Sequence, residues 1–264
     1  MKLIFIELNE INFNLVQKYI ESGYALPNFE KLFQQGVFNT SSEQEYENLE
    51  PWIQWVSAHT GKTFAEHGIF RLGDMAKSNL TQIFEKVAKK GYKVCAVSPM
   101  NTKNNLQSPV AFIPDPWTKT NTDGSWYSRF LSSAINQAVN DNSKSKITFQ
   151  SLVKLMLASF YLLSFDKLFR LLVKLPWAIS KKWRKAIFFD IYLAEIFHAL
   201  IDKKNAEFST IFLNAGAHIQ HHYMLNSKVL KGETLNPNWY ISSNDDPLFE
   251  VYQAYDKLRE RVLK

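Results

Sequence analysis

Three short runs of apolar and β-branched residues, widely separated along the chain, constrain its fold more than any other feature. They occupy residues 2–8, 92–98 and 207–213, and each has the composition of a strand buried on both faces. The segment 80–90 carries apolar residues at helical spacing, and Gly91 separates it from the second run. Helix, glycine and buried strand in succession are typical of α/β domains, so we predict an α/β fold with a parallel sheet flanked by helices.

Further helices are indicated by their end signals. Asn12 or Asn14 can cap a helix that follows the first strand, and a proline-led helix is predicted over 27–35. A short buried helix is expected over 52–60, and the chain closes with a helix over 247–263.

The middle of the chain differs in composition from its two ends. Residues 99–128 are rich in Pro, Asn and Asp and are predicted to be irregular. Residues 149–200 are predicted to be helical throughout, with a break at Pro176. We therefore predict two domains, which are an α/β core formed by 1–128 plus 205–264 and an inserted helical cap formed by 130–204.

Bulk composition excludes several classes of protein. The chain is 46% hydrophobic with a net charge of +6, and Cys95 is its only cysteine, so neither a disulfide nor a cysteine zinc site can form within it. No signal peptide is recognisable at the N-terminus, and the longest apolar run, 155–165, is shorter than a membrane span. A cytoplasmic location is expected. No nucleic-acid-binding module is recognisable, so nucleic acid is not an expected partner.

Several short motifs form an ordered set along the chain. Residues 26–37 read LPNFEKLFQQGV, Thr60-Gly61-Lys62 follows a tryptophan-rich segment, and His67-Gly68-Ile69 comes shortly after. Asn214-Ala-Gly-Ala-His218 directly follows the third predicted strand. With the opening strand, these motifs resemble the alkaline phosphatase superfamily, in particular its type I phosphodiesterase/nucleotide pyrophosphatase branch. The resemblance implies two divalent metal ions, zinc or manganese, a hydroxyl nucleophile, and hydrolysis of phosphate or sulfate esters.

The first metal position of the resembled family falls at the end of the first strand. An aspartate is expected there, and Asn9 occupies the position, with Glu7 and Glu10 on either side. A neutral amide offers one weak carbonyl ligand, so Glu7 or Glu10 would have to assist. The alternative is structural, with Asn9 capping the turn and Glu10 lying at the start of a helix.

The nucleophile position departs further from the family pattern. Counting back from Thr60 places Glu50 or Pro51 there, and neither carries a hydroxyl. Glu50 remains a candidate metal ligand, base or nucleophile. The hydroxyls of Ser57 and Thr60 lie within a predicted helix, where packing or turn roles are expected.

The motif from Asn214 to His218 has the spacing of the family's second metal motif, again with asparagine in place of aspartate. His218 is the main candidate ligand, together with Asn214 and His222. His221 and His222 could alternatively be surface residues beside Tyr223. Because ligands bind at the carboxyl ends of parallel strands, we expect this loop and the loop at Asn9 to converge.

Basic side chains alternate with Leu, Phe and Trp over 149–185. They are Lys154, Lys167, Arg170, Lys174, Lys181, Lys182, Arg184 and Lys185. Three interpretations stay open, namely a cap that binds an anionic small-molecule or lipid-linked substrate, a peripheral contact with an anionic membrane, and a solvated helix face.

Two functional hypotheses follow. The first is a metal-dependent hydrolase of the phosphodiesterase or phosphatase type. The second is a non-catalytic alkaline-phosphatase-like binding protein with a degenerate site. In the resembled family a further strand ends in Asp-His-Gly and supplies metal ligands, and no such motif follows 247–263, so the resemblance implies a core incomplete at the C-terminus.

Overall fold

The computed structural model describes residues 2–140, 147–230, 232 and 235–262 and divides into two compact units. The first unit comprises residues 1–7, 41–169 and 195–212. The second comprises residues 8–40, 170–194 and 213–264. The predicted division into a core and an inserted cap stays a prediction.

The first unit contains the sheet. Its elements are β1 (Leu3–Leu8), which ends at the boundary with the second unit, then η1 (Tyr46–Asn48), α3 (Pro51–Thr60), α4 (Phe64–His67), η2 (Asp74–Lys77), α5 (Ile83–Lys89), β2 (Val94–Val97), β3 (Ala111–Ile113), α6 (Trp126–Asn140), α7 (Phe149–Leu162) and β4 (Phe208–Leu213). The strands lie in the order β1-β4-β2-β3 and are parallel, with Cys95 opposite Ala111 and Ser209 opposite Cys95. The α/β class predicted from the sequence is therefore confirmed.

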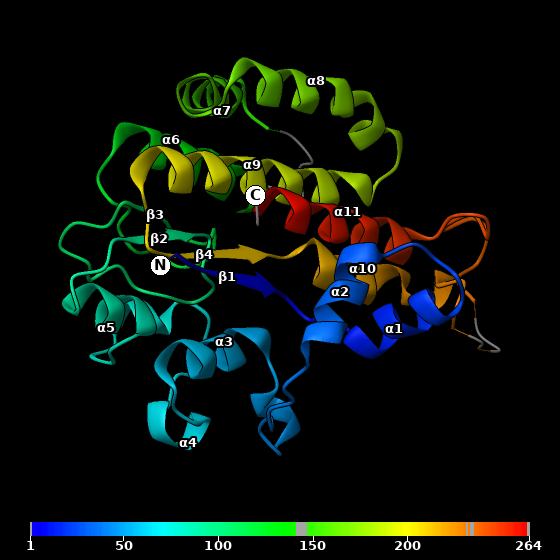
Figure 1. Cartoon of the computed structure of the whole chain (residues 1–264), viewed down its shortest axis with the longest axis horizontal. Helices are drawn as coiled ribbons and strands as arrows, with labels where there is room; N and C mark the ends of the chain where they lie inside the picture. Colours follow the sequence, from blue (N-terminus) through cyan, green and yellow to red (C-terminus); the bar gives the residue numbers. More distant parts are fainter. Residues whose placement is uncertain (1, 141–146, 231, 233–234, 263–264) are drawn as a thin grey trace. The chain divides into compact units, whose positions relative to one another are not determined.

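Helix α5 packs against the sheet through a small apolar cluster. Phe84 is buried with Val94, Phe112 and Phe208 from three different strands. Within this unit, α3 and α5 cover one face of the sheet and α6 covers the other (Figure 1). Gly91, with a φ of 85°, adopts the left-handed conformation that ends the helix and turns the chain into β2.

Residues 99–128 contain regular structure that was not predicted. Strand β3 pairs with β2 over residues 111–113, and α6 begins at Trp126, so the prediction of an irregular segment is wrong at these two places. The strand has only three residues and lies between Pro109 and Pro114. A run this short shows no alternating pattern, and only its pairing with β2 makes it a strand.

The second unit is helical. It contains α1 (Phe13–Glu21), α2 (Pro27–Gln35), α10 (Ala215–Tyr223), η4 (Met224–Asn226) and α11 (Pro247–Val262). Asn12 caps α1 by accepting a hydrogen bond from the Leu15 amide at 3.0 Å, which confirms one of the two predicted caps. Of the predicted last helix, residue 263 lies outside the described residues.

Helix α2 begins without a capping side chain of its own, because its N-cap is Leu26. Asp256 of α11 takes that role. Its carboxylate accepts hydrogen bonds from the amides of Asn28 and Phe29, both at 2.8 Å, and from the Asn28 side chain at 3.1 Å. The Pro-Asn start of this helix therefore fixes α2 to α11 within the second unit.

Two long helices cross the unit boundary, α8 (Phe165–Ser180) and α9 (Arg184–Lys204). The predicted break at Pro176 is wrong, because Pro176 lies inside α8. The helical segment is interrupted at residues 163–164 and 181–183 instead. Proline removes one backbone donor, and an exposed helix can tolerate that loss when the chain on either side stays helical.

Candidate functional site

Two loops that follow strand ends meet in the second unit, as the sequence predicted. The Asn9 amide donates to the Leu213 carbonyl at 3.0 Å. The Asn9 side-chain amide then donates to Asn214 Oδ1 at 2.8 Å. Asn9 is only 3% exposed and Asn214 is half-buried, so this hydrogen bond is partly shielded from solvent. Asn9 and Asn214, two of the metal ligands predicted from the sequence, are therefore direct partners of each other.

A buried carboxylate holds the first turn of α10. Asp190 accepts a hydrogen bond from the Ala215 amide at 2.7 Å and one from the Tyr255 hydroxyl at 2.6 Å. The Gly216 amide in turn donates to Tyr255 at 2.9 Å. A Cβ at Gly216 would collide with the Ile11 side chain, so the glycine permits this close approach. The first two backbone donors of α10 are thus already engaged.

Asp190 should make folding pH-dependent. Burial raises its pKa to about 6, against an ordinary value of 3.8. Between these pH values the folded chain keeps a proton that the unfolded chain has lost, so the stabilisation is complete below pH 4 and declines as pH rises through 6. We expect the free energy of unfolding of the native chain, relative to Asp190→Asn, to fall by about 2–4 kcal/mol between pH 4 and 7.

Urea unfolding of both chains across this pH range measures the difference, and every other carboxyl group cancels in the comparison. A difference that is flat with pH, or that grows with pH, would show that Asp190 is ionised in the folded chain throughout.

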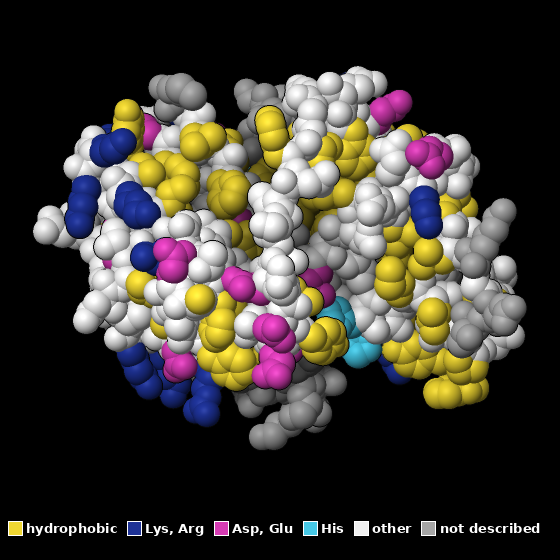
Figure 2. Space-filling view, turned by 90° about the horizontal axis from the view of Figure 1, so that it is seen from below, with side chains coloured by type: hydrophobic (Ala, Val, Ile, Leu, Met, Phe, Trp, Pro, Cys, Tyr) yellow, Lys and Arg dark blue, Asp and Glu magenta, His cyan; other side chains and the backbone are white. Residues whose placement is uncertain are grey.

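The histidines of α10 lie on its exposed side. His218 and His222, one turn apart, place their ring centroids 4.8 Å from each other. Desolvation, reinforced by the charges of His222 and His221, lowers the pKa of His218 below its usual value. The lowered pKa favours the neutral imidazole, which is the form that binds metal. Histidine side chains reach the surface on the face drawn in Figure 2.

Glu10 joins the two loops a second time. Its carboxylate lies 2.5 Å from His221 Nε2, and its carbonyl accepts a hydrogen bond from the Gln220 side chain. Gln220 also accepts from the Asn12 amide at 3.1 Å and from the Tyr252 hydroxyl at 2.8 Å. Glu10 has a φ of 54°, an uncommon value for a residue other than glycine. Gln220 is thus the buried link between the loops, and sequence reasoning missed it.

Glu7 lies in the first unit, where its side chain is fully buried. One carboxylate oxygen accepts a hydrogen bond from the Thr210 hydroxyl. The other lies 3.2 Å from His59 Nε2, and both side chains are 0% exposed. The structure thus places Glu7 in a cluster with Thr210 and His59, and its role as a metal ligand stays a prediction.

Glu50 also lies in the first unit, at the N-cap of α3. Its carbonyl accepts from the Ile53 amide at 2.9 Å, and its exposed side chain makes no capping hydrogen bond. Of the nearby hydroxyls, Ser57 pairs with His67 Nε2 at 3.0 Å, and Thr60 donates to the Val56 carbonyl of its own helix at 2.7 Å. Glu50 is therefore an exposed acid at the start of α3, and its catalytic role stays a prediction.

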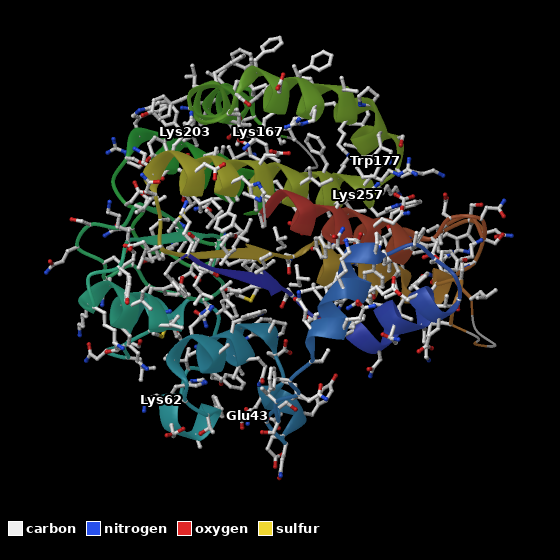
Figure 3. All side chains as sticks on the ribbon, viewed as in Figure 1. Glu43, Lys62, Lys167, Trp177, Lys203 and Lys257 are labelled. Atoms are coloured by element: carbon white, nitrogen blue, oxygen red, sulfur yellow. The ribbon has the colours of Figure 1, made fainter. Side chains whose placement is uncertain are left out.

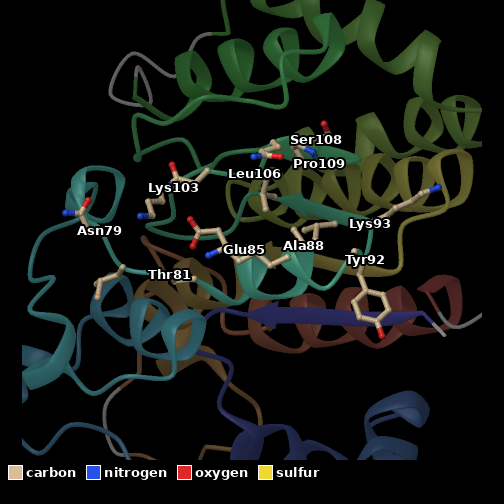
Figure 4. A pocket seen from close by; sticks show the side chains of 16 residues that line it. Asn79, Thr81, Glu85, Ala88, Tyr92, Lys93, Lys103, Leu106, Ser108 and Pro109 are labelled. Atoms are coloured by element: carbon tan, nitrogen blue, oxygen red, sulfur yellow. The ribbon is translucent and has the colours of Figure 1, made fainter.

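One cavity, of about 580 Å3, lies in the first unit between α5 and residues 103–109 (Figure 4). Glu85, Lys89 and Lys103 contribute to its lining. None of the six site residues predicted from the sequence lines it. The cavity reaches Val94, the first residue of β2, and so touches the amino end of that strand. Open parallel sheets bind ligands at the opposite ends, the carboxyl ends of their strands.

Within the described part of the chain, no three His, Cys, Asp or Glu side chains come together in a group that could hold a metal ion. Comparison of the sequence and structure with protein-family models, with curated proteins and with solved structures gave no match.

Proposed function

We propose that this chain is an alkaline-phosphatase-like protein that binds a phosphate or sulfate ester without cleaving it. The hydrogen bond between Asn9 and Asn214 carries the proposal. Two aspartates at these positions would repel each other unless a cation lay between them, whereas two amides satisfy each other directly. The pair is therefore stable with no ion present.

The donor set fits a hydrolytic metal centre poorly. The Asn214 side-chain oxygen already accepts the Asn9 amide, and amide oxygens are neutral, so they compensate none of a cation's charge. The family's nucleophile position holds Glu50 or Pro51 in place of a hydroxyl residue. Both departures favour recognition of the ester over its hydrolysis.

The ligand class follows from the resemblance and from charge. Phosphate and sulfate esters are anions, and the chain carries a net charge of +6. His218 and His222 are exposed one and two helical turns after Asn214 and can donate hydrogen bonds to an anionic oxygen. A lipid-linked ester is included in this class.

The test combines binding with turnover. Phenyl phosphate, added with a chelator, should raise the melting temperature of the chain, and His218→Ala should reduce this shift. Bis(4-nitrophenyl) phosphate with added manganese or zinc should not be hydrolysed above the buffer rate. Metal-dependent turnover that is lost in His218→Ala would overturn the proposal, and so would the absence of any shift with phenyl phosphate.

A metal-dependent hydrolase is the second candidate, and the His218–His222 pair favours it. Two imidazoles at positions i and i+4 of one helix can bind one zinc or manganese ion from the same side. If this candidate holds, the purified chain carries metal by elemental analysis, and the double variant His218→Ala/His222→Ala loses it. His198→Ala, on another helix, is the control that should retain the metal.

A further inference from the structure

Helix α8 presents its apolar side to solvent. Its exposed side chains include Phe165 (82%), Phe169 (58%), Leu172 (61%), Val173 (62%), Leu175 (41%) and Ile179 (71%). At 100° per residue these positions form one continuous arc of the helix. The buried positions of the helix are Leu171 and Ala178. A surface helix of a globular protein normally turns such an arc toward the core.

Two of the three basic side chains of α8 are partly buried, whereas Arg170 is exposed. Lys167 Nζ lies 4.0 Å from Glu195 Oε2, and the Lys174 ammonium lies 5.0 Å from the centre of the Trp177 ring. Lys167 and Trp177 point away from the outer side of the helix, on which aromatic rings project (Figure 3). Lys167 and Lys174 thus have partners within the protein, whereas the apolar arc is covered by none of the described residues.

Helix α7 repeats the pattern independently. Its exposed large side chains are Phe149, Leu152, Met156, Leu157, Phe160 and Tyr161. Its buried residues are Ser151, Ala158, Ser159 and Leu162, of which three are small. Most of the large apolar side chains of α7 are thus exposed, so the exposure on α8 is not an isolated feature.

We propose that α8 lies in the surface of an anionic lipid bilayer, with its apolar arc inserted among the acyl chains. No described helix is long and apolar enough to cross a membrane. An amphipathic helix with Phe and Leu on one side and Lys and Arg on the other binds in the interfacial plane. Between residues 165 and 180 the chain carries three basic residues and one acid, and exposed Lys182 and Lys185 follow.

Charge distinguishes this occupant from a second copy of the chain. A symmetric contact through α8 would bring the exposed basic residues of two copies, Arg170, Lys182 and Lys185 in each, toward one another, and like charges would oppose it. Anionic headgroups would neutralise the same residues and add to the burial of the apolar arc. This inference does not depend on the proposed ester binding.

Co-sedimentation with vesicles tests the proposal. We expect the full chain to bind vesicles of phosphatidylglycerol and phosphatidylcholine and to bind pure phosphatidylcholine much more weakly. Phe165→Ser/Phe169→Ser/Ile179→Ser should reduce binding to the anionic vesicles at least about tenfold. The matched control is Phe38→Ser/Tyr46→Ser/Trp239→Ser. These side chains are 96%, 88% and 86% exposed and lie outside α8.

Both triple variants replace exposed side chains, so their thermal unfolding should match that of the native chain. Absence of binding to anionic vesicles overturns the proposal, as does equal binding to both vesicle types. A concentration-dependent dimer in sedimentation velocity that the α8 variant abolishes would assign the arc to a second copy and would also overturn it. An equal loss of vesicle binding in the control variant would show that α8 is not the contact.

Discussion

Replacing Asn9 and Asn214 together by aspartate should make the stability of the chain depend on divalent metal. The two side chains are 2.8 Å apart and Asn9 is buried, so two carboxylates there would repel each other and lose the amide hydrogen bond. We expect the metal-free double variant to be less stable than the native chain by about 2–4 kcal/mol. Manganese or zinc at a hundred times its dissociation constant should restore about 2.7 kcal/mol.

Chemical unfolding with and without metal measures both effects. In the native chain the same metal concentration should leave the free energy of unfolding unchanged. Adding His218→Ala to the double variant should weaken the metal effect, because His218 lies one helical turn after position 214. If the native chain is stabilised as much as the double variant, the asparagine pair does not limit metal binding, and the non-catalytic interpretation fails.

Asp256→Ala should produce the largest loss of stability of any single substitution considered. The change leaves three donors without an acceptor, namely the amides of Asn28 and Phe29 and the Asn28 side chain. Asp256 is 5% exposed, so water cannot readily replace the carboxylate. We expect the free energy of unfolding to fall by about 3–5 kcal/mol, with α2 no longer fixed to α11.

Urea unfolding monitored by circular dichroism provides the measurement. Glu30→Ala, which removes an exposed acid from the first turn of the same helix, is the control and should cost less than about 1 kcal/mol. Asp256→Asn keeps one acceptor oxygen and should lie between the two. Equal effects of Asp256→Ala and Glu30→Ala would mean that the capping hydrogen bonds contribute little.

The strands and most helix ends could be predicted because their signals are local. The runs 2–8, 92–98 and 207–213 are apolar and long enough to be recognised alone, and Asn12 caps its helix through a residue three positions away. Strand β3 could not be recognised, because its pairing partner lies elsewhere in the chain. Likewise the cap of α2 comes from Asp256, more than two hundred residues away.

The meeting of the two loops could also be predicted, because strand ends in a parallel sheet share one edge. The residues that hold the loops together could not. Gln220 and Asp190 are polar residues at buried positions, and a sequence shows neither their burial nor their partners. The available signal for the burial of Asp190 was its position within the mostly apolar run AIFFDIYLAEIF.

The orientation of α8 could not be predicted from the sequence either. Its alternation of basic and apolar residues was visible in the sequence, and its amphipathic character is confirmed. The pattern gives two faces but does not say which one the protein covers. Surface helices of globular proteins usually expose their lysines and bury their apolar side chains. In α8, Lys167 faces Glu195 and Phe165 faces solvent.

Calorimetric titration of the native chain with manganese chloride tests the central claim most directly. Manganese prefers oxygen ligands, so it reports on the asparagine pair more than on the imidazoles. A neutral, mutually satisfied pair predicts no saturable heat at millimolar metal. A one-to-one binding isotherm that disappears in Asn214→Ala would contradict the claim and favour the second candidate function, a metal-dependent hydrolase.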